Sequence, residues 1–204
     1  MIIRSNEELD GIDFAKGNGL IPLVAQEVNT GAIRMLGYAD RAALEISLSS
    51  GFLHFWSRSR SALWMKGATS GNTLRLVSLH VDCDKDAALA LVRAEGPTCH
   101  TGAESCFDAA PFLQQLDVVI EQRAVARERS AEEAGYTNRL LADRNLRLKK
   151  IAEESGELVL ACADDDAGAV AEEAADLLYH ALVACRAAGV GLSDVVETLR
   201  KRHS

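Results

Sequence analysis

The sequence has no apolar run that approaches the roughly 20 residues of a membrane-spanning helix, so we expect no membrane association. Its first ten residues, MIIRSNEELD, turn polar after a short apolar patch, which is not the pattern of a secretory signal. Basic residues are in the minority, with 22 Lys and Arg against 30 Asp and Glu and a formal net charge of −8. Nucleic-acid backbones are held mainly by Lys and Arg, so general nucleic-acid binding is not expected.

The cysteines are few and odd in number, which argues against a disulfide framework. The five are Cys83, Cys99, Cys106, Cys162 and Cys185. In a reducing compartment such cysteines bind metals or remain as buried free thiols. We therefore expect a cytoplasmic protein in which the first three cysteines are candidate metal ligands. The last two lie in apolar helical runs and are expected in the core.

The first half of the chain has the pattern of a mainly β domain. Residues 20–28, 51–58 and 73–81 combine apolar and β-branched residues with partial alternation. One helix is expected over residues 40–49, because Gly51 follows it as a typical C-terminal stop. The glycine-rich segment 66–72 is typical of a loop.

The second half has helical periodicity from about Phe112 onward. Apolar residues from Leu140 to Val159 predict a second long helix, and two more helices are predicted over residues 169–188 and 192–200. The short acidic connection at residues 164–166 should make the second and third helices antiparallel neighbours. We place the boundary so that the two domains are residues 1–109 and 110–204, a length that suits two small domains.

Three aspartates alternate with other residues in VDCDKDA. If the preceding strand continues through this segment, Asp82, Asp84 and Asp86 lie on one face and Cys83 on the other. Three carboxylates form an oxygen-rich site suited to Mg²⁺, whereas a thiolate suits Zn²⁺. The ordinary alternative is a solvated acidic turn.

Two further cysteines follow in GPTCHTGAESCF. Cys99 and Cys106 join Cys83 to supply three thiolates, which leave the fourth position of a tetrahedral zinc open for catalysis. His100 could serve as a base or proton shuttle. Because Cys83 should point away from the aspartates' face, it could meet the other cysteines from a second subunit. The alternatives are unrelated buried thiols, or a closed structural zinc with His100 as the fourth ligand.

Acidic residues also gather on two neighbouring predicted helices. Glu153 and Glu157 are four residues apart, and Glu173 and Asp176 are three apart, so each pair shares a helix face. Antiparallel helices would bring the faces together, where the carboxylates repel unless cations neutralise them. Mg²⁺ could do so, bridging to a polyphosphate and organising an attacking water. The ordinary alternative is a solvated acidic face.

The first half resembles phosphoribosyl-AMP cyclohydrolase in several ordered motifs, from about Leu20 to Phe107. The motifs are FWSRSRSALWMKGATSGN, VDCDKDA, PTCHTG and ESCF. The resemblance implies that zinc-activated water attacks C6 of an adenine ring and that the N1–C6 bond opens. It implies that the three cysteines bind zinc across a dimer interface and that the three aspartates bind Mg²⁺.

The basic stretch and the glycine-rich loop of these motifs could hold substrate phosphates through side chains and backbone N–H groups. One of the two arginines of SRSR could instead serve only surface solubility. The tryptophan could stack on the base or fill the core, and the core is slightly favoured. The candidate substrate contacts of this half are Arg58, Arg60, Trp64, Lys66, Thr69 and Ser70.

The second half is similar to the all-α, MazG-like nucleotide pyrophosphohydrolases, a group that includes phosphoribosyl-ATP pyrophosphohydrolase. The similarity rests on Glu-Glu-x-x-Glu, on Glu-x-x-Asp and on GYTNRLL, with Gly135 where that family more often has serine. Lys150 is a candidate phosphate contact, and Glu153 and Glu157 are the candidate catalytic carboxylates. The implied magnesium ligands are Glu153, Glu154, Glu157, Glu173 and Asp176.

Together the resemblances imply an N-terminal α+β, mainly β, domain and a C-terminal all-α domain in a bifunctional hydrolase of histidine biosynthesis. The second half would convert phosphoribosyl-ATP to phosphoribosyl-AMP and pyrophosphate, and the first half would open the adenine ring. The implied partners are small nucleotides, Zn²⁺, Mg²⁺ and a second copy of the chain that shares the zinc ligands. Two alternatives remain open: a house-cleaning nucleotide pyrophosphohydrolase with a regulatory N-terminal half, and a binding protein with a structural zinc.

Overall fold

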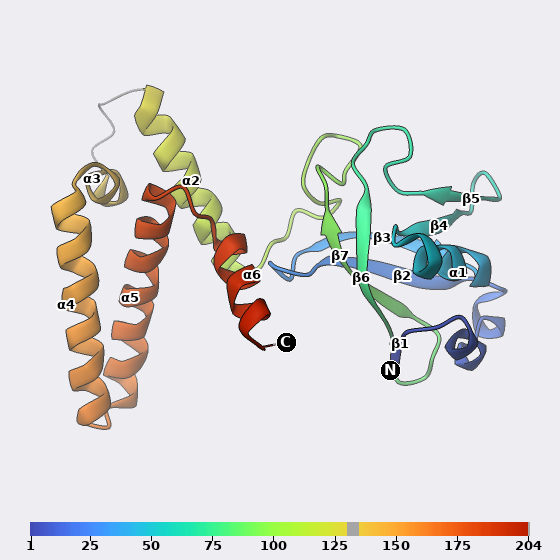
Figure 1. Ribbon diagram of the computed structural model, residues 1–204, viewed down its shortest axis with the longest axis horizontal. Helices are drawn as coiled ribbons and strands as arrows, with labels where there is room; N and C mark the ends of the chain where they lie inside the picture. The colour runs from blue at the N-terminus through green and yellow to red at the C-terminus, as the bar shows by residue number, and fades with distance from the viewer. Residues whose placement is uncertain (130–134, 204) are drawn as a thin grey trace. The chain divides into compact units, whose positions relative to one another are not determined.

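The computed structural model describes residues 1–129 and 135–203, and the side chains of residues 1–126 and 135–203. The chain divides into two compact units, Met1–Pro111 and Phe112–Ser204. The first is built on a mixed sheet and the second is helical, as the sequence predicts (Figure 1). Within the described residues, every helix is too short or too polar to cross a bilayer.

The first unit contains a seven-stranded sheet in the order β1-β6-β7-β2-β3-β4-β5. β2 and β7 pair in parallel, and the other neighbouring strands pair antiparallel. Two 3₁₀ helices, η1 (Glu7–Gly11) and η2 (Ala15–Gly17), precede β2. The strands are β1 (Ile2–Ile3), β2 (Ile21–Glu27), β3 (Ile33–Ala39), β4 (His54–Ser57), β5 (Ala62–Met65), β6 (Leu74–Val81) and β7 (Ala88–Ala94).

Alternation of buried residues positions the sheet on its core. On β2, Ile21, Leu23 and Ala25 are fully buried and alternate with partly exposed residues, as a strand with one covered face requires. The predicted helix is α1 (Arg41–Ser50). Asp40 accepts a hydrogen bond from the backbone N–H of Ala43, and the chain leaves the helix at Gly51, whose φ of 75° suits a residue without Cβ.

The strand before the aspartates ends at Val81, so the expected continuation of the strand is wrong. Asp82 Oδ1 accepts the backbone N–H groups of Asp86 and Ala87, at 3.1 and 3.2 Å, and closes the chain into a turn. Lys85 takes a φ of 65° inside that turn. A turn has no two-residue period, so the directions of the aspartates and Cys83 do not follow from the strand.

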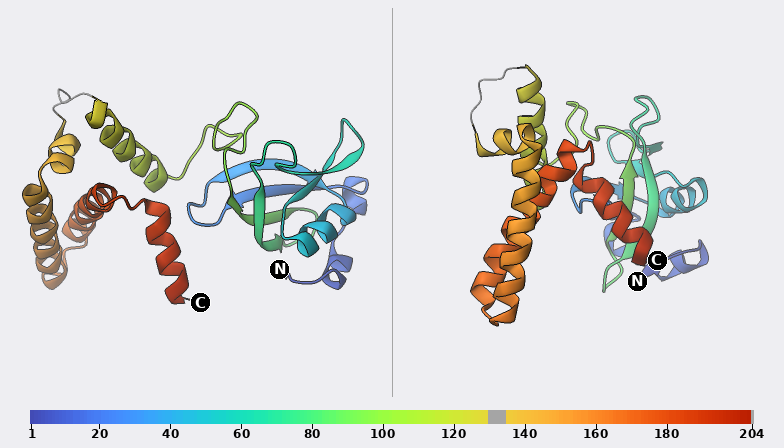
Figure 2. Two further views of the ribbon diagram at one scale, coloured as in Figure 1. Left: turned by 45° about the horizontal axis from the view of Figure 1, so that its top comes forward. Right: turned by 60° about the vertical axis from the view of Figure 1, so that its left-hand side comes forward.

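The second unit consists of five helices in its described residues. They are α2 (Phe112–Arg129), α3 (Tyr136–Ala142), α4 (Arg144–Ala163), α5 (Ala167–Ala187) and α6 (Leu192–His203). α4 and α5 form the predicted antiparallel pair and lie side by side in both views of Figure 2. A small core contains Ile120, Leu140, Leu141, Leu182 and Val183.

The predicted second long helix is in fact two helices. Asp143 has an extended backbone, with φ −99° and ψ 104°, and its side chain accepts the N–H groups of Asn145 and Leu146. This cap ends α3 and starts α4, because the capping geometry removes Asp143 from either helix. The prediction that Cys162 lies in the core is also wrong, since Cys162 is exposed, whereas Cys185 is half-buried.

Candidate functional sites

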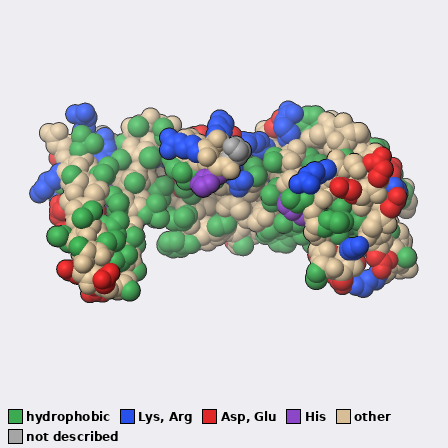
Figure 3. Space-filling model, turned by 60° about the horizontal axis from the view of Figure 1, so that its bottom comes forward, with side chains coloured by type: hydrophobic (Ala, Val, Ile, Leu, Met, Phe, Trp, Pro, Cys, Tyr) green, Lys and Arg blue, Asp and Glu red, His purple; other side chains and the backbone are tan. Residues whose placement is uncertain are grey.

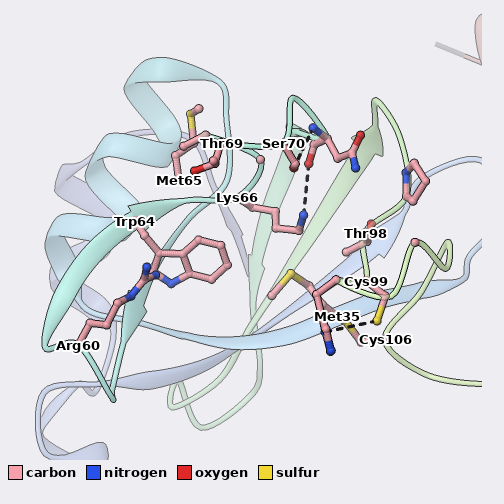
Figure 4. A pocket seen from close by; sticks show the side chains of 16 residues that line it. Met35, Arg60, Trp64, Met65, Lys66, Thr69, Ser70, Thr98, Cys99 and Cys106 are labelled. Atoms are coloured by element: carbon pink, nitrogen blue, oxygen red, sulfur yellow. Dashed lines mark hydrogen bonds between the residues drawn. The ribbon is translucent and has the colours of Figure 1, made fainter.

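A cavity of about 630 Å³ opens in the first unit between the loop after β5 and the segment after β7 (Figure 4). Met35, from β3, lies beside Cys99 and Cys106 at its base. The structure therefore brings together residues that the sequence places in three separate motifs. The predicted site residues that line the cavity are Arg60, Trp64, Lys66, Thr69, Ser70, Cys99, His100 and Cys106.

Lys66 is held at this cavity by the loop that follows it. Its ammonium lies 3.3 Å from the backbone carbonyl oxygen of Asn72, and its backbone N–H donates to Leu53. Gly67 has a φ of 87°, and a Cβ there would collide with the backbone of Asn72. The loop can therefore fold back on itself only with glycine at this position.

Cys99 and Cys106 are neighbours whose thiols differ in acidity. Thr101 Oγ1 donates to Cys99 Sγ over 3.1 Å, and this hydrogen bond lowers the pKa of Cys99. Burial, followed by the adjacent Cys99, raises the pKa of Cys106. His100 is exposed, lines the same cavity and places Nδ1 3.8 Å from Cys99 Sγ. Two sulfurs and an imidazole thus share one wall.

Cys83 does not join these two cysteines within one chain. It is exposed on the turn between β6 and β7 and does not line the cavity. Among the described residues, the groups of three potential metal ligands contain carboxylates and no cysteine. One chain thus assembles two of the three predicted zinc ligands.

Arg58 and Trp64 border a second, adjoining cavity of about 350 Å³. The guanidinium of Arg58 lies 3.8 Å from the centre of the Tyr38 ring, a cation–π contact. Trp64 stacks on the buried Phe55, with ring centroids 5.4 Å apart, and is only half-buried because its other side faces both cavities. It therefore packs on the core and also forms part of the cavity wall.

Asp82, Asp84 and Asp86 present oxygens within 4.8 Å of one another on the turn after β6. The ammonium of Lys16 pairs with Asp84 at 2.7 Å and also with Asp86. Hydrogen bonds to these carboxylates raise the pKa of Lys16, and the same bond to Lys16 lowers the pKa of Asp84. An ammonium therefore bridges two of the three carboxylates.

A second acidic group forms between α4 and α5. Glu154, Glu157 and Glu173 present oxygens within 4.8 Å of one another, although Glu154 is only 4% exposed. Partial desolvation, followed by repulsion from Glu154 and Glu173, raises the pKa of Glu157. Such mutual repulsion is the electrostatic state that a divalent cation relieves.

The other predicted residues of this site lie at its margin. Glu153 is outside the group of three and pairs with Lys150 at 2.9 Å, and Asp176 is exposed on α5. His180, on α5, is 4% exposed and lies 3.7 Å from Glu154. Burial lowers the pKa of His180.

The residues that line the first cavity and were not predicted from the sequence include Met35, Asn72 and Thr98. Asn72 closes the glycine-rich loop and Thr98 precedes Cys99 in PTCHTG, so these two motifs could have identified both residues. Met35 belongs to β3, outside these motifs, and its side chain carries no distinguishing pattern. Only the folded chain places Met35 beside the cysteines.

Comparison with known proteins assigns each unit a family. The model for phosphoribosyl-AMP cyclohydrolase matches residues 35–108, and the model for phosphoribosyl-ATP pyrophosphohydrolase matches residues 116–203. Similar proteins carry the name histidine biosynthesis bifunctional protein HisIE. That of Xanthomonas axonopodis pv. citri is 41% identical over 98% of this chain and 97% of its own length. That of Escherichia coli K12 is 43% identical over 94% and 95%. The chain therefore belongs to the HisIE family of histidine biosynthesis bifunctional proteins, with a cyclohydrolase region followed by a pyrophosphohydrolase region.

Proposed function

We propose that the chain catalyses two successive hydrolyses, each in its own unit. The helical unit, with a MazG-like fold, hydrolyses phosphoribosyl-ATP to phosphoribosyl-AMP and pyrophosphate, and the first unit opens the adenine ring of phosphoribosyl-AMP at N1–C6. The first unit contains the cavity lined by polar side chains, and its residues match the cyclohydrolase family. The second unit contains the carboxylates between α4 and α5, and its residues match the pyrophosphohydrolase family. This correspondence supports the proposal.

In the helical unit, Glu154, Glu157 and Glu173 would hold Mg²⁺. The donor set fits, because three hard oxygens lie within 4.8 Å of one another and the pKa of Glu157 is raised by repulsion that a cation would cancel. Bound magnesium would neutralise the polyphosphate and help to orient water. Glu153 and Asp176 complete the acidic margin, and Lys150 binds a phosphate oxygen.

In the first unit, Arg60, Lys66 and the hydroxyls of Thr69 and Ser70 bind substrate phosphates at the rim of the cavity. The Trp64 ring stacks on the adenine. Arg58 extends the basic rim into the adjoining cavity. These contacts orient the base with C6 toward Cys99 and Cys106.

The cavity wall formed by Cys99, Cys106 and His100 has the donor atoms of a zinc site but lacks the third predicted cysteine. Cys99 and Cys106 are adjacent, and the hydrogen bond from Thr101 favours the thiolate of Cys99. Zinc held there, with Cys83 of a second subunit, would supply a water of lowered pKa. His100 takes the proton of the attacking water and returns it as the N1–C6 bond breaks. Asp82, Asp84 and Asp86 form a separate magnesium site.

A homodimer accounts for the missing third cysteine and for apolar surface on the helices. Hydrophobic side chains are exposed along the helical unit at the left of Figure 3. On α4, the adjacent Val159 and Leu160 are 67% and 65% exposed, and contiguous exposed apolar surface is typical of a protein interface. We propose that this cytoplasmic enzyme acts as a dimer.

The test follows pyrophosphate release and ring opening separately after phosphoribosyl-ATP, Mg²⁺ and Zn²⁺ are added to the purified chain. Cys99→Ala should lose ring opening only. Glu157→Ala should lose pyrophosphate release, and with it ring opening from phosphoribosyl-ATP, but it should still open the ring of added phosphoribosyl-AMP. If pyrophosphate appears but the ring never opens, and ordinary nucleoside triphosphates are hydrolysed equally well, the chain is a house-cleaning pyrophosphohydrolase instead.

A further inference from the structure

Two charged side chains are buried under the loop that carries Cys99 and Cys106. Glu27 ends β2 and Arg34 lies near the start of β3, and they are 7% and 8% exposed. Among residues 1–111, all of which the structure describes, no other charged side chain is buried. Burial of such a pair costs desolvation and does not ordinarily add stability, so stability alone does not explain it.

Glu27 fixes the direction of the Arg34 guanidinium. Its Oε2 accepts Nη2 and Nε of Arg34, at 2.9 and 3.2 Å. The same oxygen accepts the backbone N–H of Ala94, on β7, at 3.1 Å. The carboxylate therefore joins three adjacent strands and leaves one guanidinium nitrogen, Nη1, free to face the cysteine loop.

Arg34 holds that loop through two different groups. Its Nη1 donates to the backbone carbonyl of Glu104 over 2.9 Å and also pairs with the Glu104 carboxylate. Its own backbone carbonyl accepts the N–H of Cys106 over 2.8 Å. Ser105, between these positions, donates its hydroxyl to the carbonyl of Ile33 over 2.6 Å. Three consecutive loop residues are thus attached to two consecutive residues of β3.

The loop itself has no regular secondary structure that would fix the positions of the two cysteines. Residues 99–106 contain neither helix nor strand, and within the loop the backbone N–H of Cys99 closes a turn on the carbonyl of Ala103. A tetrahedral zinc site needs sulfurs at a fixed separation, with metal–sulfur distances of about 2.3 Å. Groups that hold the ligands from behind typically change metal affinity by about 10- to 100-fold.

We propose that Arg34, oriented by Glu27, is the positioning residue of the zinc site. It attaches the loop to the sheet so that the Cys99 and Cys106 thiolates are already spaced for the metal. This inference rests on the proposed function, in which these two cysteines bind zinc. Lysine cannot replace Arg34, because an ammonium lacks the rigid fork that reaches Glu27 and Glu104 at once.

The test uses the full-length chain and two variants of this pair. Arg34→Lys keeps the charge and removes the fork. Arg34→Met combined with Glu27→Gln removes both buried charges, so the fold is not left with an unpaired ion, and the glutamine can still accept the N–H of Ala94. The matched control is Arg186→Lys, because Arg186 forms a similar part-buried pair with Asp117 in the other unit.

Zinc affinity is measured by chelator competition, and the thiolate–metal absorption band is measured after Co²⁺ loading. Thermal unfolding followed by tryptophan fluorescence monitors the fold of the first unit, which contains both tryptophans, and pyrophosphate release shows that the helical unit is intact. Both Arg34 variants should bind zinc about 10- to 100-fold more weakly, with a weaker cobalt–thiolate band and normal pyrophosphate release. The Arg186 variant should bind zinc as the wild type does.

A folded double variant with wild-type zinc affinity and cobalt band overturns the proposal, because it would show that Arg34 only balances a buried charge. This holds even if Arg34→Lys fails to fold. Cys99→Ala, measured in parallel, separates the two proposals. If it too keeps wild-type zinc affinity, the zinc assignment itself is wrong; if it loses zinc, only the role of Arg34 is at issue.

Discussion

The ammonium of Lys150 lies 3.0 Å from Oε1 of Glu154, the buried carboxylate of the helical acidic group. The same nitrogen is 2.9 Å from Glu153, and both hydrogen bonds raise the pKa of Lys150. A permanently charged donor therefore stands at the edge of the candidate magnesium site. It is held by acids on its own helix and remains partly exposed to an incoming phosphate.

Replacing Lys150 should weaken phosphoribosyl-ATP hydrolysis. A charge-assisted hydrogen bond is worth about 1.5–3 kcal/mol, so Lys150→Met should lower kcat/KM for pyrophosphate release about 10- to 100-fold. Lys149→Met removes the same charge one residue away, on an exposed position, and should have a much smaller effect. Equal losses in steady-state kinetics of the two variants would exclude a specific contact. Ring opening of added phosphoribosyl-AMP should not change in either.

Glu157→Gln should separate stability from activity. The pKa of Glu157 is raised above its ordinary value of 4.5, so ionisation of Glu157 destabilises the folded state. This destabilisation is absent at low pH, where the carboxyl is protonated, and it develops as pH rises through the raised pKa. At neutral pH without metal, the variant should therefore unfold at a higher temperature than the wild type, and the difference should vanish in acid. Far-UV circular dichroism measures this.

In the same variant, pyrophosphate release should fall by about two orders of magnitude or more, because a metal-binding oxygen anion is lost. Added Mg²⁺ should stabilise the wild type more than the variant. A variant that unfolds below the wild type at neutral pH, with unchanged Mg²⁺ stabilisation, would contradict the interpretation of these carboxylates as a repulsive cation site.

Thr101→Val should make Cys99 less reactive. The hydroxyl of Thr101 donates to the Cys99 sulfur and lowers the pKa of the thiol, so its removal should return the pKa toward the ordinary value and reduce the thiolate fraction at neutral pH. Site-resolved alkylation of the metal-free chain should become several-fold slower at Cys99. Cys106, with its raised pKa, should be the slower thiol in the wild type. Faster labelling of Cys106 than of Cys99 in the wild type would refute this order.

Gly37→Ala should destabilise the first unit alone. A Cβ at Gly37 would overlap the ring of the fully buried Phe55, and overpacking of this kind costs about 1–3 kcal/mol. Both tryptophans, Trp56 and Trp64, lie in this unit, so denaturation followed by tryptophan fluorescence reports on it selectively. Gly17→Ala, with open space at its Cβ, is the control. Equal midpoints for the two variants would show that the ring can move aside.

Much of the fold was accessible from the sequence because the signals are local. The stop at Gly51 and the apolar periodicity of α5 each depend on neighbouring residues, and the structure confirms both. Two predicted elements, the helix through Asp143 and the strand through Asp82, were wrong because a local side-chain hydrogen bond competes with the apolar pattern. The side chain of Asp143 caps a new helix inside an apolar pattern, and that of Asp82 closes a turn where the strand pattern continues.

The sequence by itself determined the two-part organisation, the acidic pairs on adjacent helices and the motifs that carry cysteine, histidine and lysine, because spacing along one element sets which side chains share a face. Only the tertiary structure decided that Glu154, Glu157 and Glu173 converge while Asp176 stays exposed. It also decided that Arg34 and Glu27 are buried beneath the cysteine loop. Such contacts join residues as far as 72 positions apart, and their geometry depends on sheet register and helix packing, which local propensity does not encode.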